Sequence, residues 1–261
     1  MKNIIKSIIY ELLHSKFLIR IYIMLLLFMV LVTALNINTG EKKGTSYMLA
    51  DNPVILYQFG IFLLSIIVGT ICGEDYKDKV GNYEILFGHS RRSIYVARTL
   101  FACIVSGILC TSLSFVPIIT GNIIGQWGNG LSLSHVVIRN LLMIFPYVRL
   151  AAFLAMITFI IKNNYIIMAS GFFLMMIISV VDAVMENGRS LYLSIFNLGL
   201  LTDYQGWNIY NIDPVSGIVE YNSYDSSIST GNIVGTILVS LIMTAFYIFM
   251  GYTLFRRDDI S

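Results

Sequence analysis

Hydrophobic residues run along this 261-residue chain in six long stretches, which short polar segments separate. About 20 apolar residues are enough for a helix to cross a bilayer. The fourth stretch is the least regular, because Pro146 and Arg149 interrupt it. The pattern predicts six transmembrane helices, at residues 17–35, 54–72, 94–119, 136–161, 165–183 and 233–255.

The first 16 residues have a different pattern from the stretch that follows. Isoleucine and leucine recur there at helical spacing, while Lys2, Lys6, Glu11 and His14 take the other face. Such a pattern is typical of an amphipathic helix that lies in the membrane interface. The alternative is a cytosolic extension of the first transmembrane helix.

The basic residues indicate how the chain is oriented. With a cytosolic N-terminus, inner segments carry twelve basic residues, and outer segments carry four. Cytosolic segments of membrane proteins are enriched in lysine and arginine. Six crossings also return the C-terminus, with Arg256 and Arg257, to the cytosol. The inner set is Lys2, Lys6, Lys16, Arg20, Lys77, Lys79, Arg91, Arg92, Arg98, Lys162, Arg256 and Arg257.

The composition supports one all-α integral membrane domain over residues 1–261. Hydrophobic residues make up 57% of the chain and charged residues 12%, against about 25% charged residues in soluble domains. A net charge of +2 does not suggest nucleic-acid binding. The three cysteines, Cys72, Cys103 and Cys110, lie in apolar stretches and predict packing residues, not disulfides. The first apolar run is too long for a cleavable signal peptide.

The longest outer segment, residues 186–231, carries five acidic residues and one basic residue. Its apolar piece, residues 191–196, is too short to cross a bilayer. We expect an interfacial or re-entrant half-helix there, capping the outer mouth of the protein.

No catalytic or metal-binding constellation is recognisable. The three histidines, His14, His89 and His135, fall in separate segments, and no HExxH spacing occurs. The phosphate-binding motif GxxxxGK[ST] is absent as well. The sequence therefore predicts a protein that is not an enzyme, holds no cofactor or metal, and draws energy from a separate subunit.

Two ionisable residues lie at membrane depth, Arg149 and Asp182. A charge in the bilayer is costly unless it is paired or hydrated. Arg149 either pairs with Asp182 or lines a water-filled cavity that meets a substrate. The alternatives are a purely structural pair, or an arginine that snorkels outward because the fourth helix starts late, at Pro146.

The cytosolic loop of residues 73–93 is dense in charge, with four acidic and four basic residues. Its apolar side chains Tyr83, Ile85, Leu86 and Phe87 predict a short helix that inserts into a groove on another protein. This helix would end at Gly88, and Ser90 would cap the third transmembrane helix. A solvated connector is the alternative.

This loop resembles the one between the second and third transmembrane helices of ABC-2 type transporter permeases. The resemblance is carried by Glu74, Gly81, the apolar residues 83–87, and Ser90 with Arg91. Asn82 departs from the family, where threonine is common at this position. Six crossings, an interfacial N-terminal helix, cytosolic termini and half-helices before the sixth crossing also match that family.

The resemblance implies a role for the loop and a set of partners. Residues 77–87 would form a coupling helix that receives motion from a cytosolic ABC ATPase subunit, which binds ATP and magnesium. Two ATPase copies and a second permease subunit, identical or homologous, would complete the complex. Substrate would pass between the first, second and fifth helices of each permease. The residues implied in ATPase contact are Glu74, Lys77, Lys79, Tyr83, Leu86, Phe87 and Arg91.

The chain is therefore expected to be a permease of the bacterial plasma membrane that exports an amphipathic peptide or a hydrophobic small molecule. Its size and apolar interior resemble permeases of bacteriocin or lantibiotic self-protection and toxic-peptide export, a form of antimicrobial resistance. A polysaccharide or lipid exporter of the same family is one alternative. A membrane scaffold or sensor that holds a cytosolic partner is another. An ion-coupled transporter fits least, because Asp182 is the only acid inside a stretch.

Overall fold

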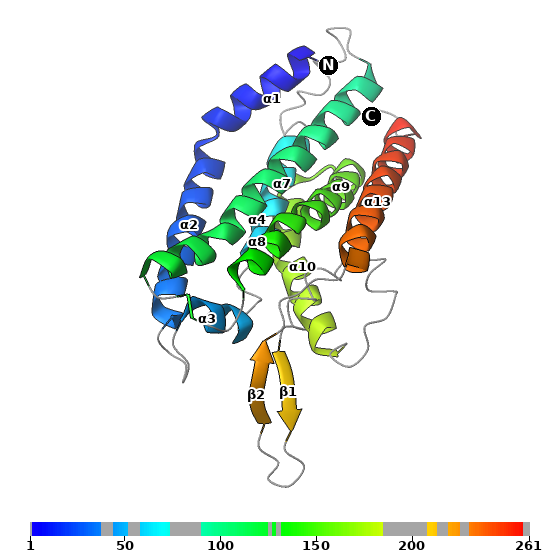
Figure 1. The fold of residues 1–261 in the computed structure, drawn as a ribbon. Coiled ribbons are helices and arrows are strands. Elements are labelled where there is room, and N and C mark those ends of the chain that lie inside the picture. The colour runs from blue at the N-terminus through cyan, green and yellow to red at the C-terminus, as the bar shows by residue number, and fades with distance from the viewer. Residues whose placement is uncertain are drawn as a thin grey trace.

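The computed structural model of the chain is a bundle of helices with one two-stranded hairpin (Figure 1). It describes residues 2–37, 44–51, 58–73, 90–124, 127–128, 132–184, 208–212, 219–224 and 230–257. The side chains of residues 178–184 and of both strands are outside this description. The elements are α1 Lys2–His14, α2 Lys16–Asn36, α3 Thr45–Asp51, α4 Gln58–Val68, the π-helical turn η2 Gly69–Gly73, α7 Arg91–Ile124, α8 Leu133–Leu142, α9 Ile144–Ile161, α10 Asn164–Val184, β1 Asn208–Ile212, β2 Val219–Tyr224 and α13 Thr230–Arg257.

Each of the six predicted hydrophobic stretches contains a helix of the structure. Four helices in the described part of the chain are long and apolar enough to cross a membrane, which is the character of a multi-pass membrane protein. The shorter apolar helices are Phe59–Gly73 and Asn164–Leu174. The four long ones are Lys16–Asn36, Arg91–Ile124, Leu133–Ile161 and Ile233–Arg256.

Local residue chemistry explains where several helices begin and end. Ser15 separates α1 from α2, and its hydroxyl accepts from the backbone N–H of Leu18 at 3.5 Å. The first apolar run is thus two helices and not one extended helix. Ser90 accepts from the N–H of Ser93 at 3.2 Å, so the predicted cap of the third hydrophobic helix is confirmed.

The fourth hydrophobic stretch is broken as the sequence suggests, but at a different residue. The break lies at Met143, between α8 and α9, and α9 continues through Pro146 and Arg149. Proline lacks an N–H and its ring clashes with the carbonyl four residues back. For Pro146 that carbonyl belongs to Leu142, the last residue of α8, so the proline acts on the chain before it.

A tight turn joins α9 to α10, as the sequence predicts. Lys162 takes the left-handed conformation with φ of 55°, and ends α9. The side chain of Asn163 then accepts from the N–H groups of Tyr165 and Ile166, at 3.0 and 3.3 Å. These bonds satisfy the first free donors of α10, so the two helices pack as antiparallel neighbours.

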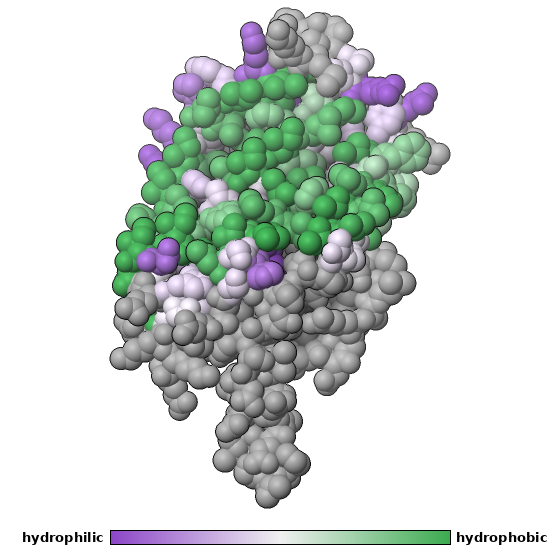
Figure 2. Space-filling model, in the orientation of Figure 1, coloured by the Kyte–Doolittle hydropathy of each residue, from purple (hydrophilic) through white to green (hydrophobic). Residues whose placement is uncertain are grey.

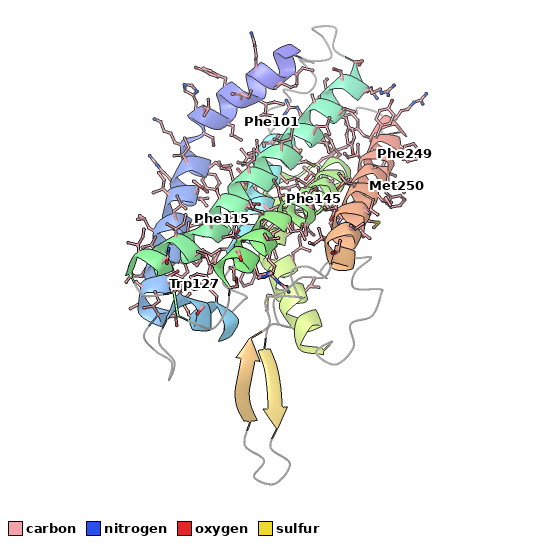
Figure 3. The ribbon with its side chains drawn as sticks, viewed as in Figure 1. Phe101, Phe115, Trp127, Phe145, Phe249 and Met250 are labelled. Atoms are coloured by element: carbon pink, nitrogen blue, oxygen red, sulfur yellow. The ribbon has the colours of Figure 1, made fainter. Side chains whose placement is uncertain are left out.

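The buried core lies along α7, which packs against α9, α4 and α2. Tyr95 of α7 and Tyr147 of α9 are its largest fully buried side chains. By contrast, α2 and α13 expose most of their apolar side chains. Figure 2 shows this surface as a broad hydrophobic band with hydrophilic residues at its two margins. Figure 3 labels aromatic members of the band on α7, α9 and α13 (Phe101, Phe115, Phe145 and Phe249). Such a band suits lipid contact.

The start of α1 and the end of α13 lie at the same end of the bundle (Figure 1). Contacts bring the end of η2, the start of α7 and the α9–α10 turn together: Gly73 packs on Asn164, and the Tyr95 ring lies 4.7 Å from that of Phe159. We call this region the terminus end. Most described basic residues that were predicted to be cytosolic belong to elements that begin or finish there.

The strands β1 and β2 form an antiparallel hairpin within the predicted outer segment, and they were not expected from the sequence. The register is irregular between Ile209 and Tyr210, so one strand carries a bulge. Figure 1 shows the hairpin at the end of the molecule away from the termini. The half-helix expected at residues 191–196 lies outside the described residues.

Candidate functional site

Most residues of the predicted docking loop lie outside the described residues, and their role stays a prediction. Of this set the structure describes Arg91, the half-buried first residue of α7. The two flanks of the loop are described: Gly73 at the end of η2, and Ser90 at the start of α7. The undescribed members are Glu74, Lys77, Lys79, Tyr83, Leu86 and Phe87.

The flank before the loop is a π-helical turn packed without space to spare. A Cβ atom added to Gly73 would lie 2.7 Å from Cβ and 2.9 Å from Cα of Asn164. One added to Gly69 would lie 2.8 Å from Cγ of Met168. Both glycines therefore let the end of α4 approach the start of α10 more closely than any larger residue allows.

Arg98 of α7 fixes this turn from the other side. Its side chain is 3% exposed, and its Nη1 donates to the carbonyl oxygen of Ile71 at 3.0 Å. A π turn interrupts the regular hydrogen bonding of an α-helix, and π turns are frequent at functional sites. Thr70 also donates within the turn, to the carbonyl of Ile66 at 2.8 Å. We call η2, Arg98 and the Asn163–Asn164 turn the π corner.

The start of α7 carries positive charge where the helix dipole disfavours it. Arg91 and Arg92 occupy the first turn, which has no acidic residue. The N-terminus of a helix has a partial positive charge, so each arginine there is disfavoured by about 0.3–1 kcal/mol. The arrangement is more favourable beside anionic groups, such as lipid phosphates or an acidic protein surface.

An aromatic cluster closes the bundle just inside the terminus end. The Tyr95 ring stacks on Phe255 at 5.8 Å and lies 6.0 Å from Tyr252, while its hydroxyl donates to the carbonyl of Ile248 at 3.1 Å. Phe159 completes the cluster, 5.2 Å from Phe255. These rings join α7, α9 and α13 in one layer.

Arg149 lies in a second polar region, between α9 and α13. Its side chain is 3% exposed, and it interacts electrostatically with Tyr247 of α13. The Tyr247 ring in turn packs on Phe153, one helical turn after Arg149, at 5.2 Å. Asp182 belongs to α10, but its side chain lies outside the described residues, so the predicted Arg149–Asp182 pair stays a prediction.

The face of α13 that meets α9 is polar or small rather than apolar. Ser240, Thr244, Tyr247 and Gly251 follow one another at helical spacing, so they share one face of the helix. Ser240 is 1% exposed, and Gly251 packs on Met156 of α9 and on Tyr95. We call this face with Arg149 the polar seam.

The sequence analysis missed several of these residues. It treated Arg98 only as one of the inner charges, and it did not single out Ser240, Thr244 or Tyr247. The spacing of the three α13 residues was a visible signal, since polar side chains recur there on one helical face of an otherwise apolar stretch. For Arg98 no comparable signal exists, because its partner is a backbone carbonyl far along the chain.

The cysteines are free thiols and buried, as expected of packing residues. Cys110 donates to the carbonyl of Gly60 at 3.2 Å, and so joins α7 to α4. Within the described ranges, no group of three histidine, cysteine or acidic side chains gathers as metal ligands.

No protein-family model matches this chain, and no curated protein matches it either.

Proposed function

We propose that this chain is the transmembrane permease subunit of an ATP-driven ABC exporter. It crosses the membrane six times with both termini in the cytosol, and residues 77–87 form the coupling helix. A cytosolic ATPase subunit, in two copies, docks on this helix and supplies the energy. A second permease subunit, identical or homologous, completes the transport path.

The observation that carries the proposal is the arrangement of elements at the terminus end. The helix α1, both flanks of the 74–89 segment and the α9–α10 turn belong to this end. A subunit that docks there contacts the loop and α1 together. The motif of Glu74, Gly81, residues 83–87, Ser90 and Arg91 supplies the family-level argument.

The π corner supports a mechanical role for the loop. A coupling helix transmits motion only if its mount is stiff, since a compliant mount would absorb the displacement. Arg98 and the two glycines fix the segment before the loop, and the Ser90 cap fixes the segment after it. Motion of the loop would then pass into α4 and α7 as rigid bodies.

The transported molecule is an amphipathic peptide or a hydrophobic small molecule. The apolar bundle supports this substrate class, since its described interior presents apolar side chains over most of its length. A scaffold or sensor with the same loop would bind a cytosolic partner but would not couple to ATP hydrolysis.

The test is co-purification from the membranes of cells that express the chain at its natural level. The unmodified chain should bring down an ATPase, and the complex should hydrolyse ATP. The variants Leu86→Asp and Phe87→Asp should lose both, because a charge replaces an apolar anchor. Unchanged hydrolysis and co-purification in both variants would refute the coupling role.

Ser90→Asp is the matched control. It adds the same charge at the edge of the same loop, and aspartate is as good a helix cap as serine. It should therefore keep the α7 start intact and leave the ATPase bound. Co-purification of a partner without any ATP hydrolysis would favour the scaffold or sensor.

A further inference from the structure

Hydroxyl side chains inside membrane helices usually satisfy themselves on their own backbone. This chain follows the habit at several places. Thr33, Thr70 and Thr158 each donate to the carbonyl four residues back, at 2.7, 2.8 and 2.7 Å. Such bonds need no partner outside the helix.

Ser240 and Thr244 do not follow it. Their hydroxyl oxygens are buried, and neither has a hydrogen-bond partner within the described structure. Ser240 is among the few buried residues of α13, at 1% exposure. Leaving a buried hydroxyl without a partner is unfavourable, and no solvent in the bilayer core relieves it.

The two hydroxyls share their surroundings with other polar groups. They lie on the face of α13 that carries Tyr247, whose phenol interacts with Arg149 across the interface. Unpartnered buried hydroxyls also occur on α7, at Thr99, Ser106 and Thr111. The α13 pair differs from these because a buried guanidinium and a phenol lie on the same interface.

We propose that the polar seam between α9 and α13 is a binding site for internal water molecules. Each water would accept from or donate to the Ser240 and Thr244 hydroxyls and bridge them toward Tyr247 and Arg149. Internal waters in proteins make two to four hydrogen bonds to otherwise unsatisfied buried groups, and this seam offers that number. The inference does not depend on the proposed transport function.

The seam is closed at the terminus end. Beyond Gly251 the interface passes into the aromatic cluster of Tyr95, Phe159, Tyr252 and Phe255. These rings fill the space between the helices, so the hydrated stretch ends there. Water in the seam thus exchanges with the opposite side of the bundle.

The test is radiolytic hydroxyl-radical labelling of the full chain in lipid nanodiscs, with ¹⁸O-labelled water. Radicals formed from a bound water oxidise the aromatic ring beside it. The ring of Phe246 is the matched control for Tyr247, since it is the next residue at 5.8 Å and faces outward with 50% exposure. A Tyr247→Phe variant removes the difference in ring chemistry.

The expected result is several-fold more ¹⁸O on residue 247 than on Phe246, both in the unmodified chain and in Tyr247→Phe. Equal labelling of the two rings, or less at residue 247, would overturn the proposal. The unmodified chain provides the answer if the variant fails to fold.

A second measurement checks the hydroxyls themselves. In a dry seam, the double change Ser240→Ala with Thr244→Val removes two unsatisfied groups and should raise Tm. In a hydrated seam it removes water partners, so Tm should stay unchanged or fall. A raised Tm would contradict bound water at this site.

Discussion

Arg98 and Arg149 are equally buried in apolar helices, at 3% exposure each, yet their surroundings differ. Arg98 donates to a backbone carbonyl in a corner where two glycines leave no free space. Arg149 lies on an interface that contains hydroxyls without protein partners. The first region is built to be stiff, whereas the second has unsatisfied polar groups that water or a moving helix can use.

The difference teaches how one bundle combines a fixed mount with a deformable interface. Tight packing with satisfied hydrogen bonds resists displacement, because any shift loses contacts on all sides. An interface with polar groups can exchange partners as helices slide, and small residues let the helices approach closely. Four changes test the comparison, from the largest expected effect to the smallest.

Charge reversal at Arg149 should have the largest effect. Arg149→Asp leaves a buried charge without its partner, which costs about 3–5 kcal/mol. If Asp182 is that partner, Asp182→Arg alone is equally harmful and the double swap restores folded protein. Yield and thermal stability in detergent measure this. A double swap as unstable as the single variants would instead make the seam the source of Arg149 solvation.

Gly73→Ala should disrupt the π corner by overpacking. Its new Cβ would lie 2.7 Å from Cβ of Asn164, and relief requires movement of backbone. We expect a loss of about 3 kcal/mol, near the upper end for overpacked sites. Gly235→Ala is the control, since nothing lies within 4 Å of its added Cβ. There the better helix propensity of alanine should stabilise α13 by about 1 kcal/mol. Similar effects at both sites would refute the tight corner.

Arg98→Met should leave the Ile71 carbonyl without its donor while keeping most of the apolar stem. The expected cost is about 2 kcal/mol, the loss of a hydrogen bond from a charged group in a buried site. Arg98→Lys keeps a charged donor and should recover part of this stability. Thermal unfolding in nanodiscs separates the two, and equal Tm values for Met and Lys would show that the hydrogen bond is not what matters.

Asn163→Ala should have the smallest effect, about 1 kcal/mol, because it removes the cap of α10 at the rim of the π corner. Asn163→Asp keeps an acceptor for the same two N–H groups and should be nearly neutral. Hydrogen exchange at Tyr165 and Ile166 reports the cap directly. Exchange that is no faster in the alanine variant would contradict its role.

The pattern of the sequence predicted much of the fold, because helix formation in apolar stretches is a local property. All six hydrophobic stretches contain helices, and the Ser90 cap and the Lys162–Asn164 turn are where the sequence predicts them. The break in the fourth stretch was predicted too, but its position at Met143 follows from the carbonyl that Pro146 excludes.

Less of the candidate site was accessible in this way. Arg149 was identified because a charge in an apolar stretch is conspicuous in any sequence. Arg98 looked like one more inner charge, and the hydroxyls of α13 looked like ordinary helix residues. Their meaning depends on what faces them, and that information is not local.

The chain by itself determined which segments are apolar helices, where most of them end, and where its charges fall, since each depends on neighbours in sequence. Only the tertiary structure decided that Ile71 offers its carbonyl to Arg98, that Gly73 meets Asn164, and that Ser240 turns toward α9. The physical reason is that hydrogen bonding and close packing inside a bundle join residues far apart in the chain. Helix periodicity sets the face on which a residue lies, but not which helix covers it.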